Sequence, residues 1–312
     1  MTFATLSSLR LAALFLAIPG ALAQTPSEPS TNNRPLPDIP TLMHEVEQHQ
    51  HTSEIVQKDY LYHEVATEQE GDGKKSETRE YDIFWINGVQ VHKLTRKDGK
   101  DLTADEQKKE DERIDREIAK AKERKVKANA KGEETDSHGH EEITVSRFLV
   151  LGSFTNPRRV QLSGRDTIAV DYTGDPKAKT RNRAEDLIRS LAGTIWVDEE
   201  DRTITRLEGH FINNFKIGAG LVINIKKDTS FSMEQRKING EVWLPSRIEG
   251  QGAARVMLFV SMNGSIHVTY SDYRKFKATS TILPGVATVT DPSATDPQPY
   301  PSGESSTAPV PQ

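Results

Sequence analysis

The sequence predicts an α+β protein that is mainly antiparallel β-sheet, and two observations carry this prediction. Short segments that alternate apolar and polar residues recur along most of the chain, as expected for strands with one buried face. Asn-Gly pairs, the strongest short signal of a β-hairpin, stand between such segments at Asn87-Gly88, Asn239-Gly240 and Asn263-Gly264. We therefore expect about ten or eleven strands in one large, curved, meandering sheet.

The strand pattern is clearest in three places. Glu80–Ile86 alternates and returns across its Asn-Gly turn as Val89–Leu94. Thr167–Tyr172 alternates in the same way, and residues 194–276 are almost purely strand-like. Pro245 interrupts one of these later strands, and because proline cannot donate to a strand ladder, it predicts an edge strand or a β-bulge there.

Four segments favour helix. Thr41 is expected to N-cap a helix that ends near residue 57, and Thr103 with Glu106 forms a capping-box pattern before a highly charged helix over 103–128. Pro176–Leu191 is amphipathic, whereas Glu141–Phe154 suits neither period cleanly and is interpreted as helix. The apolar stripe of the charged helix is thin, so we expect either a solvated surface insertion or an arm that docks a partner.

The N-terminus has the parts of a secretory signal peptide. Arg10 precedes the apolar run Leu11–Ile18, and Ala21-Leu22-Ala23 provides small residues for cleavage after Ala23. The run is shorter than the ~20 residues needed to span a bilayer. Residues 1–23 are therefore expected to be removed, which leaves an exported, soluble, periplasmic protein.

The composition sets the domain boundaries. Residues 24–38 and 284–312 are rich in Pro, Ser and Thr, and both are expected to be disordered, as a linker and a tail. Residues 39–283 then form one domain, with a charged helical insertion over about 101–140.

Composition also excludes several classes of chemistry. The chain has no cysteine, which excludes disulfides, cysteine nucleophiles and thiolate metal sites. Its net charge of −5 gives no electrostatic reason to expect nucleic acid as a partner.

Catalytic and metal-binding patterns are weak. No nucleophile elbow, zinc-protease motif, phosphate-binding loop or dinucleotide fingerprint occurs, so the sequence predicts a protein that is not an enzyme and has no cofactor. Imidazoles and carboxylates gather at His138, His140, Glu141 and Glu142, and further histidines at 44, 49 and 51. A functional metal site needs about four well-placed ligands, and both clusters lie in polar sequence, so solvated histidines are the preferred interpretation.

Binding of an apolar ligand is the better-supported prediction. Large aromatic residues lie within the predicted strands, and on a curved sheet covered by helices such residues line a cavity. The alternative is that they fill an ordinary core. The residues predicted to contact a ligand in an apolar pocket are Trp196, Phe211, Trp243 and Phe259.

Three hairpin motifs resemble a known family. They are Gly193–Glu208, Ile238–Arg247 with its Trp-Leu-Pro, and Tyr270–Phe276. These segments resemble the LolA-like outer-membrane lipoprotein-sorting proteins, including the LolB and RseB types, mainly over residues 190–280. The resemblance implies a half-open β-barrel with helices covering its concave face.

The resemblance also implies a function in the cell envelope. Such proteins carry lipoprotein acyl chains or other lipids across the periplasm, and structural relatives sense envelope stress. We therefore expect a carrier of lipid, acyl chain or lipoprotein. The alternative is a non-enzymatic interaction or stress-sensor protein that docks an envelope membrane-protein partner.

Overall fold

The computed structural model describes residues 28–30, 32–71, 73, 75–133, 135–140, 142–217, 223–256 and 260–276. The predicted signal peptide and the predicted tail over 284–312 lie outside the described residues.

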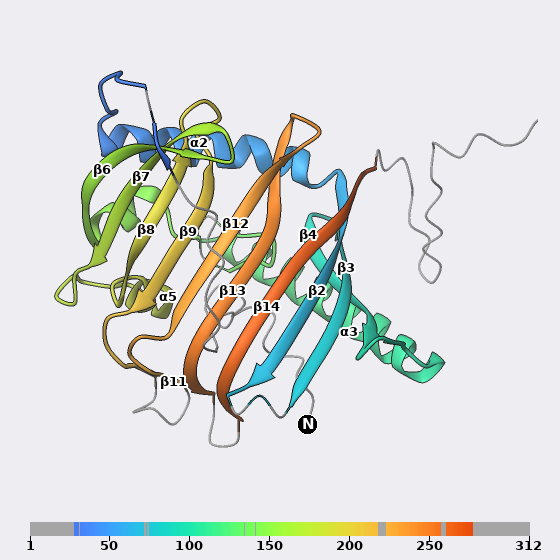
Figure 1. Cartoon of the computed structure of the whole chain (residues 1–312). Helices are drawn as coiled ribbons and strands as arrows, with labels where there is room; N and C mark the ends of the chain where they lie inside the picture. The colour runs from blue at the N-terminus through green and yellow to red at the C-terminus, as the bar shows by residue number, and fades with distance from the viewer. Residues whose placement is uncertain are drawn as a thin grey trace, which may run out of the picture. The chain divides into compact units, whose positions relative to one another are not determined.

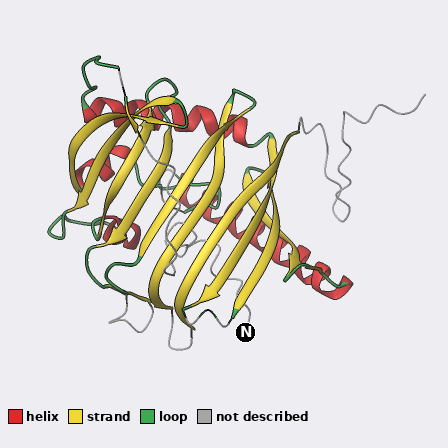
Figure 2. Ribbon diagram, viewed as in Figure 1, coloured by secondary structure: helices red, strands yellow, loops and turns green. Residues whose placement is uncertain are grey.

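One antiparallel sheet dominates the described part of the chain (Figures 1 and 2). It has 14 strands, with twelve in the order β1-β6-β7-β8-β9-β12-β13-β14-β2-β3-β4-β5 and β10 and β11 paired beside β13. The strands are β1 Glu28–Pro29, β2 Tyr60–Glu70, β3 Ser76–Ile86, β4 Val89–Lys97, β5 Lys100–Asp101, β6 Gly152–Leu162, β7 Arg165–Gly174, β8 Leu191–Asp198, β9 Ile204–Phe211, β10 Phe215–Ile217, β11 Ile223–Ile225, β12 Ser230–Ile238, β13 Val242–Val256 and β14 Val260–Lys275. Within the described residues the two end strands, β1 and β5, do not pair with each other, so the sheet is open. The predicted fold class, mainly antiparallel with a half-open barrel, is confirmed.

Four helices accompany the sheet in the described residues: α2 Ile39–Gln57, α3 Ala104–Asn129, α4 Val145–Val150 and α5 Arg183–Ile188. In Figure 1, α2 and α3 lie behind the strands, on one face of the sheet. The N-cap of α2 is Asp38 rather than the predicted Thr41. The Asp38 carboxylate accepts from the backbone N–H of Thr41 at 3.1 Å and from its hydroxyl at 2.8 Å.

Helix α2 crosses the sheet and covers two apolar clusters. Leu42 and Val46, near its start, pack on Ile168, Val170, Tyr172, Ile195 and Val197 of β7 and β8. Val56, near its end, packs against Tyr60, Tyr62, Ile83, Val242 and Leu244 of β2, β3 and β13. One face of the sheet, called the helix face below, therefore forms the core with α2.

Helix α3 covers the edge of β4. Its capping box is present as predicted, with Thr103 and Glu106 bonded reciprocally. Further along, Glu110 accepts from the backbone N–H of Leu94 at 2.8 Å, and Arg113 donates to the backbone carbonyl of His92 at 2.6 Å. These side chains satisfy groups that a neighbouring strand would otherwise pair. Because Glu110 is buried, the helix is more than a solvated insertion.

Two predicted helices are shorter than expected. The segment Glu141–Phe154 was predicted as helix, but α4 ends at Val150 and β6 begins at Gly152. Because the helix gives way to a strand at this point, Phe148 of α4 and Phe154 of β6 both pack on the ring of Tyr172. Their centroid distances to that ring are 4.7 and 5.2 Å. Helix Pro176–Leu191 is likewise reduced to α5, whose N-cap Asn182 accepts from the N–H of Glu185.

The predicted turns were right in two of three places. Asn87-Gly88 and Asn239-Gly240 both have positive φ at the two central residues, which matches the twist of a tight hairpin. The turn at Asn263-Gly264 was wrong, since both residues lie inside β14 opposite Ala253 and Gly252. The bulge predicted at Pro245 is present as a register shift between β12 and β13.

Candidate functional site

A row of apolar residues runs across the helix face of the sheet. Direct cross-strand partners share a face, and the register joins six of them in sequence: Ile195, Leu207, Met233, Ile248, Val268 and Ala66. Ile195 belongs to the cluster that packs under α2. The row, called the apolar row below, therefore begins beneath the helix on β8 and reaches β2, five strands away.

The apolar row has small residues beside it. The next cross-strand row contains Gly193, Gly209 and Phe231. A Cβ atom on Gly209 would lie 2.5 Å from Cζ of the Phe231 ring, so this ring lies directly over the glycine. The Phe231 ring therefore occupies the space that the absent side chain of Gly209 leaves beside the apolar row.

The four residues predicted to line a pocket are not brought together. Phe211 pairs with Leu191, which packs against the cluster under α2, so Phe211 lies on the helix face. Trp196 packs with Val160, Leu162 and Ala169, on the opposite face from its neighbours Ile195 and Val197. Trp243 alternates with Val242 and Leu244 and also points away from α2. Phe259 lies outside the described residues.

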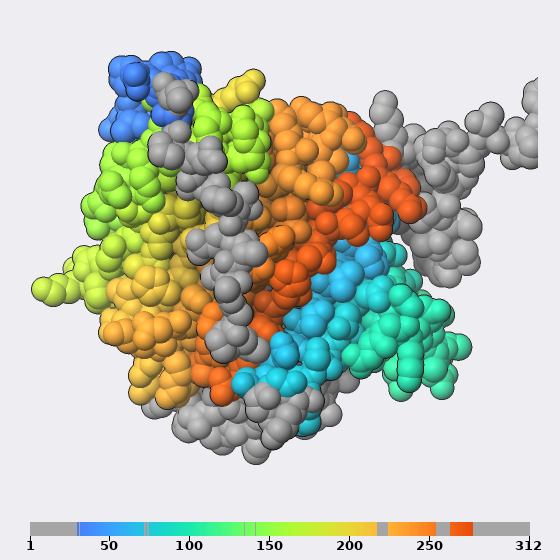
Figure 3. All heavy atoms as spheres, viewed as in Figure 1, coloured from blue at the N-terminus to red at the C-terminus, as the bar shows by residue number. Residues whose placement is uncertain are grey.

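The opposite face of the sheet is charged. In Figure 3, β13, β14 and β2 lie side by side on it. The guanidinium of Arg206 lies 5.0 Å from the ring centroid of Trp196 and is ion-paired with Glu208 and Glu234. Trp243 donates its Nε1–H to Asp201 at 2.8 Å. Both tryptophans thus have polar neighbours, which is unlike the lining of an apolar pocket.

Tyrosines close one end of the helix face. Tyr62 is stacked on Tyr273 at 5.6 Å and meets Tyr270 edge-on at 5.9 Å. Burial, assisted by the charge of Glu64, raises the pKa of Tyr62 well above its ordinary value. The phenol is therefore neutral, and it accepts a hydrogen bond from Gln90 at 3.0 Å.

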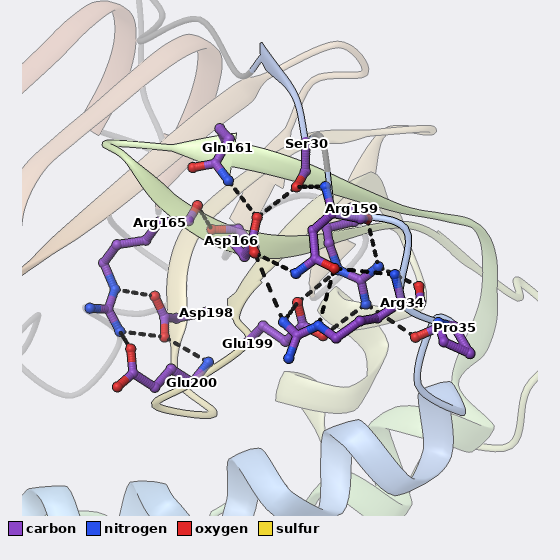
Figure 4. A network of polar contacts seen from close by, with 12 residues as sticks. Ser30, Arg34, Pro35, Arg159, Gln161, Arg165, Asp166, Asp198, Glu199 and Glu200 are labelled. Carbon is purple, nitrogen blue, oxygen red and sulfur yellow. Dashed lines mark hydrogen bonds and ion pairs between the residues drawn. The ribbon is translucent and has the colours of Figure 1, made fainter.

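A polar network at the far end of the sheet holds the chain that leads into α2 (Figure 4). Residues 28–30 and 32–38, called the N-terminal strap below, fall within the predicted disordered linker. Arg159 is 5% exposed and forms a bidentate ion pair with Glu199 at 2.7 and 2.8 Å. Its remaining N–H groups donate to the backbone carbonyls of Asn32, Arg34 and Pro35.

A second contact fastens the same strap. Asp166 accepts from the hydroxyl of Ser30 at 2.6 Å and from the amide of Asn32 at 2.8 Å. These two hydrogen bonds, helped by the charges of Arg34 and Arg159, hold the pKa of Asp166 below its ordinary value. The strap is thus fixed at two points before α2 begins.

Beside the strap lies an open polar cleft of about 420 Å³. It is lined by Arg34, Gly164, Arg165, Asp166, Asp198, Glu199 and Glu200. The carboxylate of Asp198 is 1% exposed and is paired with Arg165 at 2.5 and 2.9 Å. Each buried carboxylate of the cleft already has a partner within the protein. These contacts stabilise the tips of the hairpins that form the cleft.

In the described residues, the histidines of the candidate metal cluster each contact one carboxylate. His138 contacts Glu117 at 3.1 Å, and His140 contacts Asp136 at 3.2 Å. Burial lowers the pKa of His138, against the opposite effect of Asp136 and Glu117. The described part of the chain contains no group of three or more His, Asp or Glu able to hold a metal ion. Glu141 lies outside the described residues.

Comparisons with known proteins give similarities in structure only. No protein-family model matches the chain, and no curated protein matches it. An outer membrane lipoprotein-sorting protein domain from Vibrio parahaemolyticus is similar over 76% of this chain and 95% of its own, at 8% identity and a TM-score of 0.34. A DUF1329 family protein from Desulfovibrio piger covers 77% and 93%, at 11% identity and a TM-score of 0.31.

A third solved structure is the Pseudomonas aeruginosa MucA/MucB complex. One chain of it is similar over 75% of this chain and 100% of its own, at 8% identity and a TM-score of 0.21. All three likenesses are below 25% identity. At these identities they concern the arrangement of strands and helices alone. Within the described residues, no helix combines the length and apolarity needed to cross a membrane.

Proposed function

We propose that this chain is a periplasmic binding protein that carries a lipid, acyl chain or lipoprotein in the cell envelope, without catalysis. The observation that supports it best is the apolar row on the helix face of an open sheet. Phe211, on the same face, is proposed as a further contact.

The dimensions of the row suit an acyl chain. Five strand-to-strand intervals of ~4.8 Å give a length of about 24 Å. One leaflet of a bilayer has a hydrocarbon depth of ~15 Å, half of the ~30 Å core, so the acyl chain of a membrane lipid would fit along the row.

The free energy of burying an acyl chain is also sufficient to hold it. Each buried methylene contributes ~0.8 kcal/mol, so ten of them supply roughly 8 kcal/mol before the cost of association. Retention of a lipid therefore needs no charged or catalytic group.

Native mass spectrometry of residues 24–312 purified from the periplasm, followed by solvent extraction, tests the proposal. We expect a reproducible bound mass that extracts as lipid. Met233→Asp places a charge in the apolar row and should abolish this mass. Thr269→Asp is the matched control, because Thr269 lies opposite Arg247 on the other face.

Two outcomes would contradict the carrier function. A clean apo mass with no uptake of fluorescent fatty acids would make the apolar row ordinary core, and the alternative interaction or stress-sensor protein would then be favoured. Equal lipid retention by wild type and Met233→Asp would remove the row from the binding site.

A further inference from the structure

The ends of α2 and α3 meet at the tip of the β3–β4 hairpin. Lys125 of α3 donates to the backbone carbonyl of Gly88, in the hairpin turn, at 3.0 Å. Lys58, just after α2, lies 5.7 Å from the ring centroid of Trp85, near the end of β3. Burial and the nearby charge of Lys58 lower the pKa of Lys125, and the charge of Glu54 raises it. The two helix ends therefore form one continuous surface.

This surface is strongly basic in a chain that is acidic overall. Residues 119–131 contain six Lys or Arg and one Glu, a net charge of +5, whereas the whole chain carries −5. The first part of the same helix, residues 104–118, has four Lys or Arg against seven Asp or Glu. Positive charge is thus concentrated at one end of α3, and Lys120, Lys122, Lys127 and Lys131 are all exposed.

Two large aliphatic side chains are exposed among these lysines. Ile55 of α2 is 67% exposed and Val126 of α3 is 62% exposed. The inward residues of α3 in this part are Ala121 and Ala128, which are buried, so Val126 points outward. Exposed aliphatic side chains surrounded by lysines are typical of a surface that inserts shallowly into a lipid interface.

We propose that the surface formed by Ile55, Lys58 and the basic end of α3 over 119–131 docks on a membrane that carries anionic phospholipids. The lysines would contact headgroup phosphates, and the two aliphatic side chains would enter the boundary between headgroups and acyl chains. Glu54, Asp59, Glu123 and Glu133 lie among or beside these residues and reduce the net attraction, with Glu123 paired to Lys127 and Glu133 to Lys131. The attraction must therefore come from the lysines that outnumber them.

The residue types favour a lipid surface over a protein partner. Protein interfaces concentrate their binding energy in Trp, Tyr and Arg anchors. Arg124 of this surface is half-buried and donates to the backbone carbonyl of His138, so its exposed cations are lysines, which are flexible point charges, beside single aliphatic side chains. Neither provides the planar, bidentate recognition that a structured protein epitope uses.

Vesicle co-sedimentation of residues 24–312 tests the docking surface. The probes are vesicles of equimolar phosphatidylglycerol and phosphatidylcholine, and vesicles of phosphatidylcholine alone. We expect binding to the anionic vesicles only, and loss of binding as salt is raised. The triple variant Lys122→Gln, Lys127→Gln, Lys131→Gln should reduce the partition coefficient at least tenfold, since each lysine near an anionic surface contributes about fivefold.

The matched control removes three exposed cations from the acidic half of the same helix: Lys108→Gln, Lys109→Gln, Arg116→Gln. It should bind anionic vesicles like the wild type. The double variant Ile55→Ser, Val126→Ser should weaken binding while leaving its salt dependence unchanged. Equal loss in both triple variants, or equal binding to neutral vesicles, would overturn the proposal. Met233→Asp should still dock, so failure of docking is distinguishable from failure of lipid retention.

Discussion

Replacing Arg159 by Met tests whether the N-terminal strap is held by a buried ion pair. Arg159 and Glu199 have side chains 5% and 13% exposed. Removing one partner of a buried pair costs about 3–5 kcal/mol, because the remaining charge stays buried. Arg34 still lies 3.2 Å from Glu199 and partly compensates. We therefore expect Arg159→Met to lower the free energy of unfolding by about 3 kcal/mol.

Urea unfolding measures this loss, and hydrogen exchange of the amides over 32–38 measures release of the strap. Arg158→Met is the control, because the pair of Arg158 with Asp171 is more exposed and should cost no more than about 1 kcal/mol. A double-mutant cycle with Glu199→Gln isolates the pairwise term. Equal costs for the two arginine variants, or a coupling below about 0.5 kcal/mol, would refute the reasoning.

Three further predictions concern other parts of the fold. Gly209→Ala should destabilise by about 1–3 kcal/mol in thermal unfolding, because the new Cβ meets the Phe231 ring, and Phe231→Leu should recover part of the loss; no loss would contradict the close approach. Glu110→Ala removes the acceptor of the Leu94 N–H, so analytical ultracentrifugation should show concentration-dependent association through the β4 edge rather than a monomer throughout. A hydrogen-bonded ion pair with Arg147 holds the pKa of Glu185 below its ordinary 4.5, so this carboxylate stabilises the fold above pH 4.5 and the contribution disappears as pH falls through the folded pKa. Glu185→Gln should flatten the decline of unfolding free energy below pH 4.5, and an unchanged profile would contradict the assignment.

Local signals in the sequence predicted most of the local structure, and the exceptions are the turn at Asn263-Gly264 and the N-cap at Thr41. The capping box at Thr103, the turn at Asn87-Gly88 and the bulge at Pro245 each depend on a few neighbouring residues, and all three are present. The segment 141–154 failed because the contacts that divide it between helix and strand come from Tyr172, far along the chain.

The candidate site depended on information that alternation does not contain. The pattern around Trp196 shows that it opposes Ile195 and Val197, but not which of these faces meets α2. The packing of Leu42 and Val46 on the sheet decides which face meets α2. The apolar row was missed for a related reason, since its members become neighbours only through the register of six strands. Phe211 lies on the helix face, and its contact with a ligand stays a prediction.

The composition of α3 follows from what it covers. A helix that packs on the face of a sheet needs a broad apolar stripe, whereas one that lies along an edge strand meets unpaired N–H and C=O groups. Glu110 supplies an acceptor and Arg113 a donor, three residues apart on the same side of the helix. The thin apolar stripe is therefore the signature of a helix that covers a sheet edge.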